Sequence, residues 1–175
     1  FILGAFQGAM GWYMVRSGLV DDPRVSHFRL TAHLGVAFLI FAAMFWVALN
    51  LLREAAQGVQ RDARRRTLAH VALALVWIVF GMVLTGGLVA GIRAGFAYNT
   101  FPLMNGHLIP PEIFMIEPWY LNFFNNMATV QFDHRLLAWV LVLTALGLWL
   151  ACRRLEPNDI ARGAANWLLA ALILQ

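Results

Sequence analysis

Two histidines in long apolar stretches are the residues of this sequence best suited to chemistry. His33 lies twenty residues before Arg53, and His134 lies nineteen residues before Arg153. On a helix, each histidine then lies roughly 30 Å from that arginine, so the two share a depth. An ionisable residue inside a membrane span is costly and is a functional candidate by default. Neutral imidazoles from facing helices suit a b-type haem, and an interhelical hydrogen bond is the alternative role.

Two further histidines lack these features. His70 lies four residues after Arg66, roughly 6 Å into its helix from the opposite end, which is too far in depth to share an iron with the others. We expect His70 to pack or cap, and we expect the loop residue His107 to have a surface role. Zinc would need three or four clustered ligands, and the single cysteine, Cys152, forms neither a disulfide nor a multi-cysteine metal site.

The elements that must hold these histidines are membrane helices. Hydrophobic residues make up 61% of the 175 residues and charged residues only 13%, against roughly 25% charged in soluble domains. Residues 34–52, 67–92 and 136–152 contain no Asp, Glu, Lys or Arg, and each stretch is close to the roughly 20 residues that cross a bilayer. Residues 1–15 and 163–175 are apolar but shorter, as expected of spans cut from a longer protein. The sequence therefore predicts an all-α, polytopic transmembrane helical bundle in contact with the lipid bilayer.

The arginines orient these helices. All thirteen basic residues are Arg, and five of them fall between residues 53 and 66. By the positive-inside rule this segment is cytoplasmic, and the segment 93–130 is then extracytoplasmic. No basic face alternates with stacking aromatic residues, so the net charge of +4 does not indicate a nucleic-acid partner.

The segment 93–130 is the one long connection between apolar stretches. It holds four of the six prolines and five asparagines, so it is not one continuous helix. Its aromatic residues suit either an anchor at the membrane surface or a lid over a site, and both interpretations stay open. The glycines of residues 86–91 lie inside an apolar span, where helix packing through small residues explains them better than a dinucleotide-binding loop.

A weak internal repeat relates the two histidines. An Arg-Ser-Gly run at 16–18 precedes His33, and an Arg-Ala-Gly run at 93–95 precedes His134. The same helical hairpin thus occurs twice, with the second loop longer by about two dozen residues. Such repeats are common in membrane folds that bind ligands between halves.

Several runs of this sequence resemble haem A synthase of the mitochondrial and α-proteobacterial type. In chain order they are GWYMVRSGL at 11–19, RVS at 24–26, RLTAHLG at 29–35, AYNTFPLM at 97–104 and VQFDHR at 130–135. The resemblance implies an eight-span enzyme of a bacterial or mitochondrial inner membrane that oxidises the C8 methyl of haem O to the formyl group of haem A. It also implies a resident haem b, haem O as substrate, and haem O synthase and cytochrome oxidase assembly factors as partners. Residues 1–66 would end an amino-terminal four-helix half, and residues 67–175 would begin the carboxy-terminal half.

The same resemblance implies roles for individual residues. His33 and His134 would ligate the iron of different haems, with partner ligands outside this chain. The family's catalytic Glu would also lie outside it, and three residues before His134 stands Gln131 instead. Because an amide does not act as a carboxylate base, the half with His134 would hold haem b and His33 would hold haem O. Arg29 and Arg135 would bind haem propionates, with snorkelling to the membrane interface as the alternative.

Two other functions fit the residues themselves. A cytochrome b-type electron carrier would show the same intramembrane histidines without turning over a substrate. A non-catalytic helical membrane protein would bind no haem. Haem content separates the last from the others, and haem A made from haem O separates the first two.

The orientation is testable by impermeant thiol labelling of a single cysteine placed at Gln57, within the arginine-rich segment. We expect no labelling from the outer side of intact cells and full labelling after lysis, because arginines stay on the cytoplasmic side. A probe in the segment 93–130 is the matched control and should label in intact cells. Labelling of the Gln57 position from outside would reverse the orientation.

Overall fold

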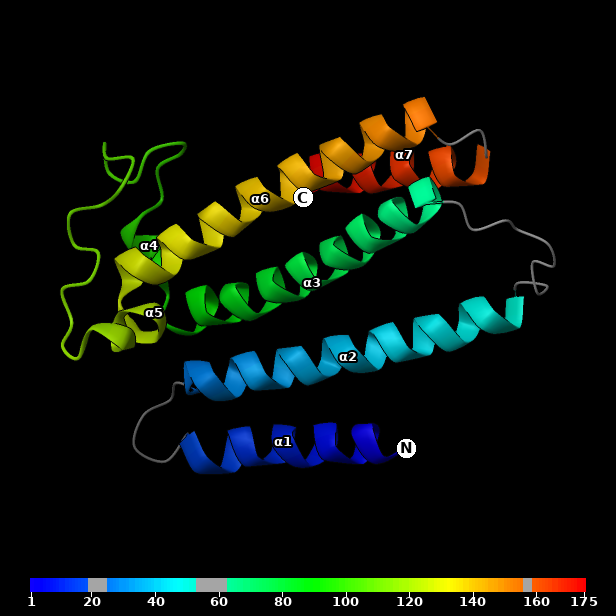
Figure 1. The fold of residues 1–175 in the computed structure, drawn as a ribbon. Coiled ribbons are helices and arrows are strands. Elements are labelled where there is room, and N and C mark those ends of the chain that lie inside the picture. Colours follow the sequence, from blue (N-terminus) through cyan, green and yellow to red (C-terminus); the bar gives the residue numbers. More distant parts are fainter. Residues whose placement is uncertain (19–24, 53–62, 156–158) are drawn as a thin grey trace. The chain divides into compact units, whose positions relative to one another are not determined.

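The computed structural model describes residues 1–18, 25–52, 63–155 and 159–175. Its elements, in chain order, are α1 (Ile2–Gly18), α2 (His27–Leu52), α3 (Ala63–Gly91), α4 (Ala94–Ala97), the 3-10 helix η1 (Trp119–Leu121), α5 (Asn122–Asn125), α6 (Met127–Leu155) and α7 (Asp159–Leu174) (Figure 1). Within these ranges there is no β-strand, only an isolated bridge between Met104 and His107. The prediction of an all-α fold is confirmed. Most of the arginine-rich connection predicted to be cytoplasmic lies outside the described residues.

Three helices are long and apolar enough to cross a membrane. α2, α3 and α6 have 26, 29 and 29 residues, with mean hydropathies of 2.3, 2.3 and 2.0 in their most apolar windows. Each contains most or all of one predicted charge-free stretch, so the three predicted spans are confirmed. Each helix also begins earlier than that stretch, at His27, Ala63 and Met127, because charged residues near the bilayer surface continue a helix while their charges stay near water.

The described helices group into two compact units. The first comprises Phe1–Glu54 and Phe80–Leu136, and the second comprises Ala55–Val79 and Leu137–Gln175. α3 and α6 each contribute one end to each unit. Because this grouping cuts through helices, it does not bear on the division into halves at residues 66 and 67, which stays a prediction.

In the first unit, α2 and the end of α3 meet at two glycines of α3. A Cβ on Gly87 would lie 2.8 Å from Thr31 Oγ1 and 3.0 Å from Thr31 Cα. A Cβ on Gly91, one helical turn further along, would overlap the Cβ of His27 and lie 2.6 Å from its Cα. Only a residue without a side chain allows the backbones to come this close. The predicted role of this glycine-rich run in helix packing is confirmed.

The segment between α4 and α6 is folded around two asparagines. Asn122 is fully buried; its amide donates to the carbonyls of Ile116 and Trp119, both at 2.7 Å, and its Oδ1 accepts from Asn126 Nδ2 at 2.8 Å. Asn126 Oδ1 accepts from Ala128 N at 2.8 Å and so caps the start of α6. The prediction that this connection is not a continuous helix is confirmed.

The second unit packs the first part of α3 against the last part of α6 and against α7. One cluster of buried side chains in this unit consists of Leu148, Cys152 and Ala165. Trp149 Nε1 on α6 donates to Asn166 Oδ1 on α7 at 2.8 Å, which satisfies both polar groups within the apolar contact. This unit contains His70, whose side chain is exposed.

Adding a methyl group at Gly91 should destabilise the protein, because the new Cβ collides with the backbone of His27. We expect Gly91→Ala to cost about 1–3 kcal/mol, the usual range for overpacking, seen as a lower thermal midpoint of the full-length parent protein in detergent. The matched control is Gly147→Ala in α6, where a Cβ would meet nothing within 4 Å. Equal losses in the two variants would refute the close approach.

Candidate functional site

His33 lies on α2 and faces α1. Its Cε1 lies 3.3 Å from the position that a Cβ on Gly11 would occupy. Gln7 Nε2 donates to the His33 carbonyl at 3.1 Å and lies 3.3 Å from His33 Nε2. His33 Nδ1 is buried without a hydrogen-bond partner, and so is Gln7 Oε1. The described residues therefore satisfy the imidazole of His33 only in part, and an unsatisfied buried nitrogen is costly.

His134 lies on α6 and faces α3. Its Nδ1 is 2.8 Å from Thr85 Oγ1, and the Thr85 hydroxyl donates back to the carbonyl of Gly81 at 3.0 Å. A hydroxyl has a single hydrogen, so when Thr85 donates to Gly81 its oxygen accepts from Nδ1 of His134. In this arrangement Nε2 keeps its lone pair, which is the form of imidazole that binds iron.

The two histidines occupy equivalent places. Cε1 of His134 lies 3.4 Å from the position of a Cβ on Gly86, as Cε1 of His33 does at 3.3 Å from that of Gly11. His33 is six residues from the start of α2 and His134 is seven from the start of α6, so both lie about 9–11 Å along their helices. Each imidazole thus packs against a glycine of the other long helix in its hairpin, Gly11 on α1 or Gly86 on α3. A larger side chain at either glycine would displace the imidazole.

The two arginines of the predicted site make contacts within the chain. Arg135 Nη2 donates to the Tyr98 carbonyl at 2.7 Å and Nη1 to the Leu103 carbonyl at 3.4 Å. Arg135 therefore fastens the loop to α6 beside His134. The guanidinium of Arg29 lies 4.6 Å from the ring centroid of Tyr13, over the ring face. Binding of propionates by these arginines stays a prediction.

Three polar residues near the histidines have no counterpart in the sequence-based site. Gln7 and Thr85 contact the two imidazoles, and His27 Nε2 is buried without a hydrogen-bond partner at the contact with Gly91. What marks Gln7 and Thr85 is that each faces a histidine of the neighbouring helix. The spacing of residues along one helix does not reveal such a contact. Across the described parts of the chain, no group of three His, Cys, Asp or Glu side chains is placed to hold a metal ion.

Comparison with known proteins places the chain in a family. Residues 1–175 match the family described as Cytochrome oxidase assembly protein (COX15-CtaA). Over the whole chain, it is 59% identical to heme A synthase of Nitrosospira multiformis, 53% identical to that of Nitrosomonas eutropha and 44% identical to that of Parvibaculum lavamentivorans. The chain covers 49%, 49% and 48% of these proteins, or about half of their length. No solved structure matches it.

The family assignment agrees with the fold. Three helices able to span a membrane, together with the family match, make this a multi-pass membrane protein. The motif runs that carry the resemblance lie around His33 and His134, where the two equivalent sites are found. The chain belongs to the cytochrome oxidase assembly protein family, COX15-CtaA.

Proposed function

We propose that the parent protein of this chain is a haem A synthase, a membrane oxidoreductase that converts the C8 methyl of haem O to the formyl group of haem A. The observation that carries the proposal is the pair of equivalent histidine sites in a chain 59% identical throughout to a relative named heme A synthase. Haem O synthase and cytochrome oxidase assembly factors as partners belong to the same proposal.

The residues present fit a haem iron. His134 offers an Nε2 lone pair because Thr85 fixes the proton on Nδ1. Nε2 of His33 faces the Gln7 amide at 3.3 Å, in a place that an iron could take, and Gly11 and Gly86 leave room beside the imidazoles that any Cβ would reduce. Each site supplies one ligand from the described residues, and a second ligand to each iron is assigned to the rest of the parent protein.

The haem iron, when bound, supplies the oxidative chemistry, and the protein supplies binding and orientation. In our proposal His134 ligates the resident haem b, with Thr85 orienting its ring. His33 would hold haem O through Nε2, the nitrogen that the Gln7 amide contacts in this structure. Gly11 and Gly86 keep both imidazoles against the neighbouring helix.

Gln131 supports placing the resident haem on the His134 side. Its side chain is buried, and its Nε2 donates to the Tyr98 carbonyl at 3.4 Å, beside the bond from Arg135. A neutral amide serves this structural contact, whereas a carboxylate would face a carbonyl oxygen that it cannot donate to. The residue that stands in the place of the family's Glu therefore has a role in holding the loop.

The proposed role of Thr85 predicts a loss of haem binding without loss of the histidine itself. Thr85→Val removes the acceptor for Nδ1 of His134 at nearly constant volume, so we expect affinity for the resident haem to fall about 10–100-fold, as for other residues that orient metal ligands. The measurement is the b-type haem spectrum of the purified full-length parent protein. His134→Ala should abolish that spectrum.

Two variants serve as controls for this loss. Thr67→Val changes the same residue type on α3, where the hydroxyl only bonds back to the Ala63 carbonyl. His70→Ala removes an exposed histidine from the second unit. Both should keep the spectrum, and equal haem loss from His70→Ala and His134→Ala would contradict the assignment.

The proposed reaction is tested by the haem products of two further variants. We expect His33→Ala to retain the resident haem and to make no haem A from haem O, because the substrate would lose the imidazole that holds it. Gln131→Glu should not raise turnover, because the reacting methyl lies at the other haem. Haem extraction and chromatography of the full-length variants give both quantities. Normal haem A yield from His33→Ala would show that the two sites are assigned the wrong way round.

A further inference from the structure

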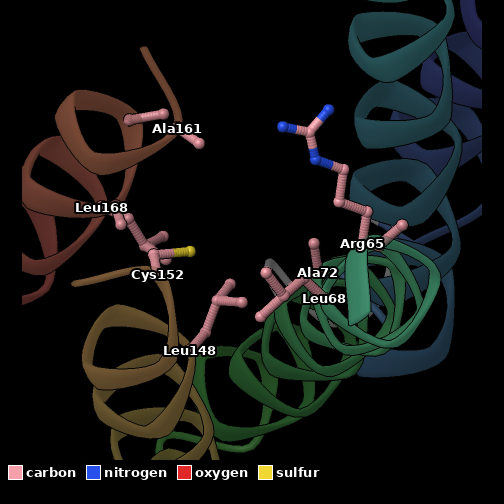
Figure 2. Close-up of a pocket in the computed structure, with 10 residues that line it drawn as sticks. Arg65, Leu68, Ala72, Leu148, Cys152, Ala161 and Leu168 are labelled. Atoms are coloured by element: carbon pink, nitrogen blue, oxygen red, sulfur yellow. The ribbon is translucent and has the colours of Figure 1, made fainter. Parts of the chain in front are cut away.

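An apolar groove lies in the second unit, away from the histidine sites. It has a volume of about 340 Å³ and is walled mostly by alanine and leucine side chains of α3, α6 and α7. Figure 2 shows Leu68 and Ala72 on one side, with Leu148, Cys152 and Leu168 opposite. Apart from Arg65 and the thiol of Cys152, the lining consists of alanine and leucine side chains, so the groove suits a hydrocarbon chain.

One end of the groove is cationic. Arg65 belongs to the lining, and Figure 2 shows its guanidinium extending from α3 toward Ala161 on α7, across the open side. A smaller polar hollow of about 170 Å³ is lined by Arg153, Arg162 and Asn166. Arginines from the start of α3, the end of α6 and the start of α7 therefore gather at the same end of the three helices.

The arrangement of the second hollow is fixed by contacts between helices. The guanidinium of Arg153 lies 5.0 Å from the ring centroid of Trp149, and the indole of Trp149 donates to Asn166 at 2.8 Å. An aromatic ring with a polar edge is typical of the level of lipid headgroups. The end of α6 and the start of α7 thus lie at the level of lipid headgroups, as the start of α3 with Arg65 does.

The sequence of this unit is also basic. Residues 55–79 and 137–175 contain seven Arg and three acidic residues, Asp62, Glu156 and Asp159. Basic pockets between the ends of membrane helices bind anionic lipid headgroups. The headgroup of a zwitterionic lipid carries a positive charge of its own, which the same arginines would repel.

We propose that this groove is a binding site for one anionic phospholipid. An acyl chain lies in the alanine- and leucine-lined groove, and the phosphate lies at Arg65, the arginine of the groove lining. Arg153 and Arg162 add positive charge at the same end of α6 and α7. The lipid connects the three helix ends, and it stabilises the second unit without taking part in the haem chemistry. The proposal is independent of the function proposed above.

Native mass spectrometry of the full-length parent protein in detergent tests the site, with added phosphatidylglycerol or phosphatidylcholine as probes. We expect one phosphatidylglycerol to be retained and phosphatidylcholine to be lost. Arg65→Gln should weaken phosphatidylglycerol binding about fivefold, the factor that corresponds to about 1 kcal/mol for one arginine at an anionic headgroup. Arg65→Lys, which keeps the charge, should bind nearly as well as the unchanged protein.

Two controls separate a site from general attraction to basic residues. Arg64→Gln removes the same charge from the adjacent residue, which does not line the groove, and it should leave binding unchanged. Ala72→Phe fills the groove without changing charge and should abolish retention of the lipid. Equal weakening by Arg64→Gln and Arg65→Gln would overturn the proposal.

Thermal unfolding of the same variants supplies a second measurement, the shift of the midpoint on adding lipid. This shift can be measured even for a variant of low stability. Phosphatidylglycerol should raise the midpoint of the unchanged protein and of Arg64→Gln, and should raise it little in Ala72→Phe. Equal effects of the two lipids would contradict the proposal. The proposal would also be contradicted if no lipid were bound and Ala72→Phe were severely destabilising. That result would mean that another part of the parent protein fills the groove.

Discussion

Polar atoms buried among membrane helices must find partners within the protein, and this constraint determines the geometry of both histidine sites. In hydrocarbon no water is available to satisfy an imidazole nitrogen. His134 meets the constraint through Thr85, which leaves its second nitrogen with a lone pair. His33 meets it only in part through Gln7, and its Nδ1 has no partner. The described residues therefore satisfy the imidazole of His134 more completely than that of His33.

Helix contact in this environment depends on small residues, because lipid offers no hydrophobic force that would press two apolar helices together. Gly87 and Gly91 let α3 approach the backbone of α2 at Thr31 and His27. Glycine recurs beside each candidate ligand, at Gly11 and Gly86. Backbone packing and ligand placement thus use the same property of glycine, the absence of a Cβ.

The sequence predicted the spans and the two histidines because both depend on composition along a single helix. Charge-free stretches located α2, α3 and α6, and prolines excluded a continuous helix between Gly95 and Asn126. Partners across helices were not predictable, since Thr85 and Gln7 have no special spacing relative to His134 and His33. The hydrogen bonds of Arg135 to the carbonyls of Tyr98 and Leu103 were likewise not predictable, and propionate binding by Arg135 stays a prediction.

The difference between the two histidine sites supports assigning them to a permanent and an exchanging haem. The hydroxyl of Thr85 bonds Nδ1 of His134 and leaves Nε2 available. A haem bound through Nε2 would therefore leave the Thr85 contact intact, and the ring would stay oriented. The amide of Gln7 instead contacts Nε2 of His33, so ligation through that nitrogen requires the amide to move and departure of the haem allows it to return. A resident cofactor needs the first arrangement. A substrate that must leave after oxidation is better served by the second, because the contact that replaces the iron lowers the cost of the empty site.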